Sequence, residues 1–348
     1  MADRLTVKTP EAAALAEEIF LCLGVPHDDA ALVSGCFLRA ETGGMPSHGF
    51  MRLRPTAERL KTGLVNPRPD IRRELLADNI LRYDADGAMG QVAGHRAMAD
   101  CVRIARERGS AFAAIRRAFH FGMMSEYTLM AAEKGCLAFV CTNSSAQMAP
   151  WGGIDRALGT NPFAVAFPEE GEDCFSLDIS TAAAARGKIR LAAREGRSIP
   201  EGWAIDPEGR DTTDPEAALR GTVLPMAGHK GFGMAMAVDM LSGILTGADL
   251  SYEASNMFEG REKVNTGCFM AVLDISRFVS PEEYETRAAG WLSRLRASAP
   301  RPGSGGIRVP GDTRNALRRE EPKTVTLSRD TWEDMHRLLE ELNGGNAT

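Results

Sequence analysis

Apolar side chains recur with helical spacing near both ends of the chain. Between residues 9 and 23 they form one stripe. Thr9 suits the N-cap of this helix, Pro10 its first position, and Gly24 its end. The glycine-rich segment 43–49 is predicted to be a loop. Helices with the same apolar spacing are predicted over 29–41, 50–62 and 330–343.

The middle of the chain alternates between short apolar runs and helical spacing. The runs 111–115 and 137–142 predict buried strands, and 122–134 predicts a helix between them. This order predicts a βαβ unit whose two strands pair in parallel. Ligands bind beyond the carboxyl ends of such strands, where the segment 116–122 lies. Further strands are predicted over 162–167 and 175–179.

Two later segments have clear patterns. Residues 230–245 are apolar on nearly all sides, which predicts a buried helix. The stretch 300–306 is rich in proline, glycine and serine and predicts a loop or linker. With 348 residues, 44% of them hydrophobic, the chain is long enough for a large core or for two domains that share an interface.

Charge and cysteine usage exclude several classes of protein. A net charge of -6 gives no overall basic footprint for nucleic acid, and no apolar run is long enough to span a bilayer. The first residues lack a signal-peptide core, so we expect a cytoplasmic protein. Seven dispersed cysteines without a CxxC pair indicate small buried side chains in a reducing compartment. The six histidines lack metal-ligand spacing, so no metal is expected.

Ser47, His48 and Arg52 form the first candidate site. Histidine exchanges protons near neutral pH, and arginine binds a carboxylate through two parallel hydrogen bonds. Together they suit a 2-oxo acid, with Arg52 on the carboxylate and His48 protonating the carbonyl oxygen. Taken alone, the segment is explained more simply as a surface loop with a salt-bridging arginine.

A second candidate is the glycine-rich segment 228–233, which contains His229 and Lys230 and precedes the predicted helix 230–245. Free N–H groups at a helix start, close backbone approach and a lysine suit a phosphate, although such loops often serve only packing. No G-x-G-x-x-G follows a predicted strand, because Arg308 stands where the last glycine of 303–308 would be. A dinucleotide would therefore bind without the Rossmann fingerprint.

A collinear series of short motifs resembles the malate/L-lactate dehydrogenase family, which binds NAD or NADP on a non-Rossmann fold. Its members also act on sulfolactate, ureidoglycolate, diketogulonate and cyclic imino acids. The resemblance extends over about 41–332. The motifs are Ser47-His48-Gly49 with Arg52, His120-Phe121-Gly122, Ala149-Pro150-Trp151-Gly152-Gly153, Gly159-Thr160-Asn161-Pro162, Leu177-Asp178-Ile179-Ser180-Thr181, Ala185-Arg186-Gly187-Lys188-Ile189, 199–206, Gly228-His229-Lys230-Gly231 and Ile307-Arg308-Val309-Pro310-Gly311.

The resemblance implies hydride transfer between a nicotinamide cofactor, NAD or NADP, and a small 2-oxo or 2-hydroxy carboxylic acid. His48 would exchange the proton, with Ser47 orienting it and Lys188 nearby. Arg52 would bind the substrate carboxylate, and Thr160 would line the substrate pocket. The implied cofactor-binding residues are His120, Phe121, Gly122, Asp178, Ile179, Ser180, His229, Lys230, Gly305, Gly306, Ile307, Arg308, Val309, Pro310 and Gly311.

The resemblance also implies an α/β architecture and a homodimer. A non-Rossmann cofactor domain with a mixed sheet would span 117–277. The segments 1–116 and 278–348 would together build a largely helical second domain.

Two alternatives remain open at this stage. One is a reductase of cyclic imino acids such as pyrroline-2-carboxylate or piperideine-2-carboxylate. In that branch of the family an acidic residue tends to replace Lys188. The other is a catalytically inactive binding protein on the same fold, against which His48 and Arg52 argue. Thr56 and Ala118 depart from residues frequent in the family, Tyr and Ser, so the substrate side chain stays open.

Overall fold

A mixed β-sheet organises the molecule in the computed structural model, which describes residues 4–169, 171, 173–256, 262–320 and 322–344. Within these residues, seven strands form the sheet in the order β2-β3-β4-β10-β5-β6-β7, and β3–β4 is its one parallel pair. This confirms the predicted α/β class. The strands are β2 (Arg72–Ala77), β3 (Ile80–Asp84), β4 (Ser110–Ala118), β10 (Thr266–Asp274), β5 (Cys136–Thr142), β6 (Phe163–Pro168) and β7 (Cys174–Ile179).

The central strand, β10, comes from much later in the chain than its neighbours β4 and β5. Its position contradicts the predicted parallel pairing of those two strands. It pairs antiparallel with β4 on one side and with β5 on the other, so that Cys268 faces both Ile115 and Thr142. The strands β4 and β5 therefore run parallel to each other but do not pair. The predicted adjacent parallel pair was wrong, because a local pattern cannot show a strand that inserts from elsewhere in the sequence.

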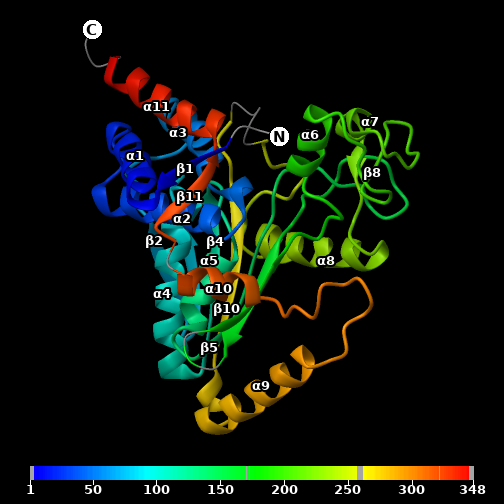
Figure 1. Cartoon of the computed structure of the whole chain (residues 1–348). Coiled ribbons are helices and arrows are strands. Elements are labelled where there is room, and N and C mark those ends of the chain that lie inside the picture. The colour runs from blue at the N-terminus through cyan, green and yellow to red at the C-terminus, as the bar shows by residue number, and fades with distance from the viewer. Residues whose placement is uncertain (1–3, 170, 172, 257–261, 321, 345–348) are drawn as a thin grey trace.

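Helices cover one face of the sheet. α4 (Gly90–Arg108) packs on β4 and β10, and α5 (Ser125–Ala132) packs on β5 and β6 (Figure 1). Alternate side chains of β10, such as Met270, are fully buried beneath these helices. The opposite face carries half-buried phenylalanines, including the stacked pair Phe112–Phe269. This two-sided alternation is the period expected of a strand.

A helical layer with its own core lies at one end of the sheet. It contains α1 (Thr9–Cys22), α2 (His27–Thr42), α3 (Leu53–Lys61) and α11 (Arg329–Gly344), with the two-stranded sheet β1 (Arg4–Lys8)–β11 (Thr324–Ser328) (Figure 1). The two ends of the described chain are thus paired. Thr9 is the first helical residue rather than the predicted N-cap. Lys8 precedes it as the last residue of β1, and the Thr9 amide donates to the Lys323 carbonyl.

A smaller unit packs around a third apolar cluster. Its elements are α6 (Arg186–Arg194), β8 (Ala204–Ile205), α7 (Pro215–Arg220), β9 (Thr222–Val223), α8 (His229–Asp239) and the π-helical turn η3 (Met240–Ile244). The prediction that residues 230–245 form a buried helix was half wrong. The helix exists, but Met240 is 57% exposed and Ile244 is 60% exposed. Only the opposite side, with Ala235 and Val238, packs into the chain's own core.

The last part of the chain returns across the sheet. It contains η4 (Ile275–Arg277), α9 (Pro281–Arg296) and α10 (Asp312–Glu320), and the predicted loop 300–306 lies between α9 and α10 (Figure 1). The predicted domain boundary at residues 116 and 117 falls inside β4. Within the described ranges, every helix is too short or too polar to cross a bilayer.

Candidate active site

Part of the segment predicted to be a loop over 43–49 forms a short helical turn, and a second turn begins the predicted helix 50–62. The two turns are η1 (Pro46–His48) and η2 (Phe50–Arg52), and they lead directly into α3. The Glu41 carboxylate accepts a hydrogen bond from the Phe50 amide at 2.9 Å, and burial raises the pKa of Glu41 to about 7. A Cβ at Gly49 would overlap this carboxylate, so a larger residue there would displace the Glu41 side chain from its contact. The hydrogen bond from Phe50 to Glu41 therefore attaches the segment that carries His48 to α2.

His48 and Arg52 are both half-buried. Ser47 Oγ lies 3.0 Å from His48 Nδ1, which leaves Nε2 as the nitrogen available to a substrate. Burial and the charge of Arg52 lower the pKa of His48 to about 4, so its imidazole is neutral near pH 7. Arg52 donates from Nε to the Ser47 carbonyl at 2.6 Å. Burial and the charge of Arg190 lower the pKa of Arg52 to about 10, so it stays protonated.

His120 lies beside His48, with 5.6 Å between the ring centroids. It follows the end of β4, as predicted. The Gly122 amide donates to its Nδ1 at 3.0 Å, so the neutral ring carries its proton on Nε2. Burial, Arg52 and His48 hold the pKa of His120 well below its usual value. A neutral imidazole with a fixed donor nitrogen can therefore face a ligand close to His48.

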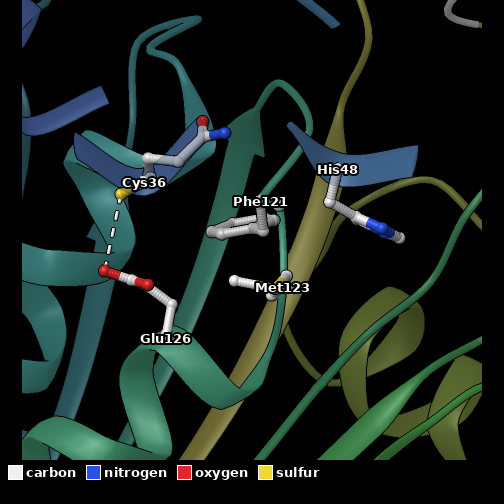
Figure 2. A pocket seen from close by; sticks show the side chains of 7 residues that line it. Cys36, His48, Phe121, Met123 and Glu126 are labelled. Carbon is white, nitrogen blue, oxygen red and sulfur yellow. Dashed lines mark hydrogen bonds between the residues drawn. The ribbon is translucent and has the colours of Figure 1, made fainter. Parts of the chain in front are cut away.

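Figure 2 shows what lies behind His48. Phe121 and Met123 stand between His48 and the Cys36–Glu126 pair, and all five line one small cavity of about 10 Å³. Phe121 is 1% exposed, and its carbonyl accepts a hydrogen bond from the Tyr127 hydroxyl. Its side chain therefore packs beside His48, and a contact of Phe121 with the cofactor stays a prediction.

Thr160 is held in place by hydrogen bonds to its backbone carbonyl oxygen. That oxygen accepts hydrogen bonds from the Thr181 amide, the Thr181 hydroxyl and the Ser180 hydroxyl, each at 3.0 Å. The next residue, Asn161, has φ of 28° and is fully buried. Its side chain forms hydrogen bonds with the Ala235 carbonyl and with the Ser251 hydroxyl. These bonds hold the backbone of Asn161 in a conformation that residues other than glycine rarely adopt. The structure thereby joins Thr160 to the end of β7.

The strand β7 connects several predicted cofactor residues. Asp178 accepts hydrogen bonds from the amide and the hydroxyl of Ser125, at 2.9 and 2.7 Å, at the start of α5. Only two residues separate Ser125 from Gly122, so Asp178 lies close to the His120 segment. Two residues before Asp178 on β7, the Ser176 amide donates a hydrogen bond to the Pro310 carbonyl at 3.1 Å. The loop 305–311 therefore runs beside the same strand.

A larger cavity of about 320 Å³ opens beside this loop. Its polar lining comes from Ser176, Arg308, Thr313 and Arg314. Hydroxyl and guanidinium groups are the donors that phosphate oxygens accept from. This donor set fits the phosphate-bearing part of a dinucleotide.

Three further predicted residues lie apart from this group. His229 and Lys230 are exposed at the start of α8, where the His229 ring faces Trp151 at 6.4 Å between centroids. Gly231 follows, and a Cβ there would overlap the Met226 carbonyl, which explains the glycine by packing. Lys188 is exposed in the first turn of α6. Contacts of Lys188 with His48, and of His229 and Lys230 with a cofactor, stay predictions.

Sequence reasoning missed Arg190, which lies on α6 within electrostatic range of Arg52. No motif links residues 52 and 190, because their proximity depends on how α6 is placed beside the η2 turn. Lys188 and Arg190 are two residues apart, so about 200° of helical rotation separates them. The two side chains thus leave α6 in nearly opposite directions.

Sequence reasoning also missed a polar cluster behind the site. Ligand atoms of Cys36, His95 and Glu126 lie within 4.8 Å of one another, a spacing that a metal ion could use. The Arg39 guanidinium already donates to both Glu126 and Cys36. We therefore describe the cluster as an ion-pair network. Its members come from α2, α4 and α5, which is why no sequence spacing shows it.

Comparisons with known proteins agree with this geometry. A family model described as malate/L-lactate dehydrogenase matches residues 7–336. L-sulfolactate dehydrogenase from Methanocaldococcus jannaschii is 36% identical over 300 residues, which cover 86% of each chain. (2R)-3-sulfolactate dehydrogenase (NADP(+)) from Chromohalobacter salexigens is 36% identical over 318 residues, 91% of this chain and 93% of its own. The solved delta1-piperideine-2-carboxylate reductase from Pseudomonas syringae pvar. tomato superposes with a TM-score of 0.86 at 30% identity, over 96% of this chain and 99% of its own.

Proposed function

Because this chain belongs to the malate/L-lactate dehydrogenase family, we propose that His48 and Arg52 are the residues that act directly on its substrate. The chain is an NAD(P)-dependent oxidoreductase that transfers hydride between the nicotinamide and a small 2-oxo or 2-hydroxy carboxylic acid. The observation that carries the proposal is a half-buried imidazole, held at Nδ1 by Ser47, beside a half-buried guanidinium.

The roles follow from the chemistry of the two groups. Arg52 binds the substrate carboxylate through its planar fork, and Thr160 lines the pocket around the rest of the substrate. In the direction of oxidation, neutral His48 accepts the hydroxyl proton at Nε2 while the C–H bond breaks. In the reverse direction, protonated His48 returns that proton to the carbonyl oxygen. The nicotinamide, when bound, supplies the hydride acceptor or donor.

We place the cofactor along the residues that the resemblance implies. His120, Phe121 and Gly122 would meet its nicotinamide end, and Asp178, Ile179 and Ser180 would follow along β7. His229 and Lys230 would contact its pyrophosphate, and the loop 305–311 would hold its adenosine end. In this proposal the segment 117–277 holds most of the cofactor, and the segments 1–116 and 278–348 complete the substrate side. The hydrogen bonds of Asp178 to Ser125 and of Ser176 to Pro310 support this path.

A homodimer in the cytoplasm completes the proposal. The exposed apolar side chains of α8 and η3 favour a dimer, because a group of large apolar side chains left exposed along one helix is typical of an interaction site. These side chains are Met234, Met236, Met240, Ile244 and Leu245. All seven cysteines are unpaired, and six of them are buried, which fits a reducing compartment.

Reduction of cyclic imino acids is the second candidate, since the solved piperideine-2-carboxylate reductase shares the fold. The charges at the site favour the first candidate. Arg52 already lies within electrostatic range of Arg190, and a protonated imine would bring another positive charge to this place. A carbonyl substrate brings none, and its developing alkoxide is stabilised by nearby cations.

The function is tested by measuring kcat/KM for linear 2-oxo acids and for pyrroline- and piperideine-2-carboxylate with the same cofactor. We expect higher values for the 2-oxo acids. His48→Asn should lower turnover on the order of 100- to 10,000-fold, whereas the exposed His27→Asn should leave it unchanged. Arg52→Lys should raise KM while cofactor affinity stays constant. Faster turnover of the cyclic imines would favour the second candidate, and full activity of His48→Asn would remove His48 from the mechanism.

A further inference from the structure

The cavity of about 320 Å³ beside loop 305–311 has an unusual charge balance. Arg308 and Arg314 bring two guanidinium groups to its lining, and Ser176 and Thr313 bring hydroxyls. Among the described residues that line it, none is a carboxylate. The neighbouring Asp312 already accepts hydrogen bonds from Arg296 at 2.5 Å and from the Val309 amide at 2.9 Å. The cavity is therefore suited to an anion.

Arg314 is held in place by groups from two other parts of the chain. It lies in the first turn of α10 and donates from Nη1 to Ser176 Oγ on β7 at 2.5 Å. Its Nη2 contacts Met45 Sδ at 3.8 Å, just before the turn that carries His48. Arg314 is half-buried, whereas Arg308 is exposed at the rim. One arginine is thus fixed at the wall of the cavity, and the other lines it from an exposed position.

The strand β7 sets the distance between this cavity and the candidate active site. Ser176 and Asp178 alternate along β7, so they point to one side of the sheet, and Ser180 follows directly after the strand. Four residues of strand span about 13 Å. Ser180 bonds the Thr160 carbonyl at the substrate end, and Ser176 bonds Arg314 at the other end. On the cofactor path proposed above, with the nicotinamide near His48 and Thr160, the adenosine would lie toward Ser176.

We propose that Arg314, Ser176 and Arg308 bind the 2′-phosphate of the adenosine, so that this chain prefers NADP(H) over NAD(H). The inference rests on the proposed function, since it assumes that a dinucleotide lies along β7. A phosphate matches the bidentate fork of arginine, whereas the free 2′-hydroxyl of NAD(H) is selected by a carboxylate. The cavity offers guanidinium groups at that position and no carboxylate within the described lining.

The test is an equilibrium titration of the full chain with NADPH and with NADH, followed by cofactor fluorescence. The wild type should bind NADPH more tightly. Arg314→Gln and Arg308→Gln should each raise the Kd for NADPH by roughly 10- to 100-fold, as expected for a lost charge-assisted contact. The Kd for NADH should change less than about threefold. Arg301→Gln removes the same charge from the exposed loop 300–306 and serves as the matched control, with both Kd values unchanged.

A second measurement uses the phosphate-bearing half of the cofactor alone. 2′,5′-ADP should compete with NADPH far better than 5′-AMP does, and Arg314→Gln should remove that difference. Arg308→Gln keeps the test valid if Arg314→Gln fails to fold, because Arg308 is an exposed side chain. Equal weakening of NADH and NADPH would overturn the phosphate assignment and leave the dehydrogenase function intact. Absence of binding by either cofactor would instead contradict the proposed function itself.

Discussion

Three side chains that can carry a positive charge lie close together at the candidate active site: His48, Arg52 and His120. Only Arg52 is charged near neutral pH, because burial and the arginine itself keep both imidazoles neutral. An anionic substrate changes this balance, since its carboxylate offsets the charge of Arg52. In the enzyme without substrate, His48 is therefore neutral and able to accept a proton. Protonation of His48 becomes easier once a carboxylate is bound.

Because oxidation and reduction require opposite protonation states of His48, kcat/KM should depend on pH differently in the two directions. For oxidation of a 2-hydroxy acid, kcat/KM requires neutral His48 in the free enzyme, so it should be constant from about pH 5.5 to pH 8. For reduction of the 2-oxo acid, kcat/KM requires the protonated form. It should fall about tenfold per pH unit over the same range, because the pKa of His48 is about 4.

The pH dependence is checked by initial rates in both directions in buffers of constant ionic strength. His120→Gln provides a comparison, because it removes a neighbouring imidazole without removing His48. An oxidation profile that breaks near pH 6.5, the ordinary value for histidine, would contradict the lowered pKa of His48.

At the scale of elements, α2, α4 and α5 are tied together by a single carboxylate. Glu126 on α5 pairs with Arg39 on α2 and with His95 on α4, and its side chain is 9% exposed. Burial opposes ionisation of Glu126, but the hydrogen bond from His95 and the charge of Arg39 outweigh it and lower its pKa to about 2. The junction behind the candidate active site therefore depends on the ionised carboxylate.

Acid should weaken this junction in a defined range. The pKa of Glu126 is lower in the folded chain than in the unfolded chain, so its contribution to stability is present above about pH 4.5 and is lost as pH falls toward 2. Wild type should lose about 2 kcal/mol more free energy of unfolding than Glu126→Gln between pH 6 and pH 3. Urea titrations of both proteins at each pH measure this difference. Parallel curves across that range would show that Glu126 carries no such contribution.

Elements whose own side chains determine them were predictable from sequence. The helix predicted over 29–41 is α2, and the strand predicted over 137–142 is β5, each within two residues of its ends. The motif around His48 also identified the candidate site. Pairings across the sequence were not predictable. No periodicity shows that β10 separates β4 from β5, that Arg190 approaches Arg52, or that Arg314 reaches Ser176.

The apolar side of α8 and η3 shows a further limit of sequence patterns. Its side chains have the spacing of a buried helix, yet Met240, Ile244 and Leu245 are exposed in the single chain. Apolar periodicity indicates only that a surface avoids water. It cannot distinguish a surface covered by the same chain from one covered by a second copy.

For the whole molecule, we therefore predict that the double variant Met240→Asp/Ile244→Asp is a monomer. Two charges placed in an apolar interface are strongly unfavourable unless they are paired. Light scattering coupled to gel filtration should give twice the chain mass for wild type and the single mass for the variant. Leu76→Asp on β2, an equally exposed apolar position in the sheet, is the control and should remain dimeric. A wild type with the mass of one chain would contradict the homodimer.

The position of β10 has a consequence for how the molecule is made. During synthesis, β4 and β5 emerge long before β10, and each keeps an unpaired edge until residue 274 has left the ribosome. At 5–20 residues per second this interval lasts roughly 7–26 s after β5 appears. Open strand edges attract other chains, and pairing over such long sequence separations is slow. The nascent chain therefore passes through a period in which two open strand edges can pair with other chains, and a chain truncated before β10 lacks the strand that joins β4 to β5.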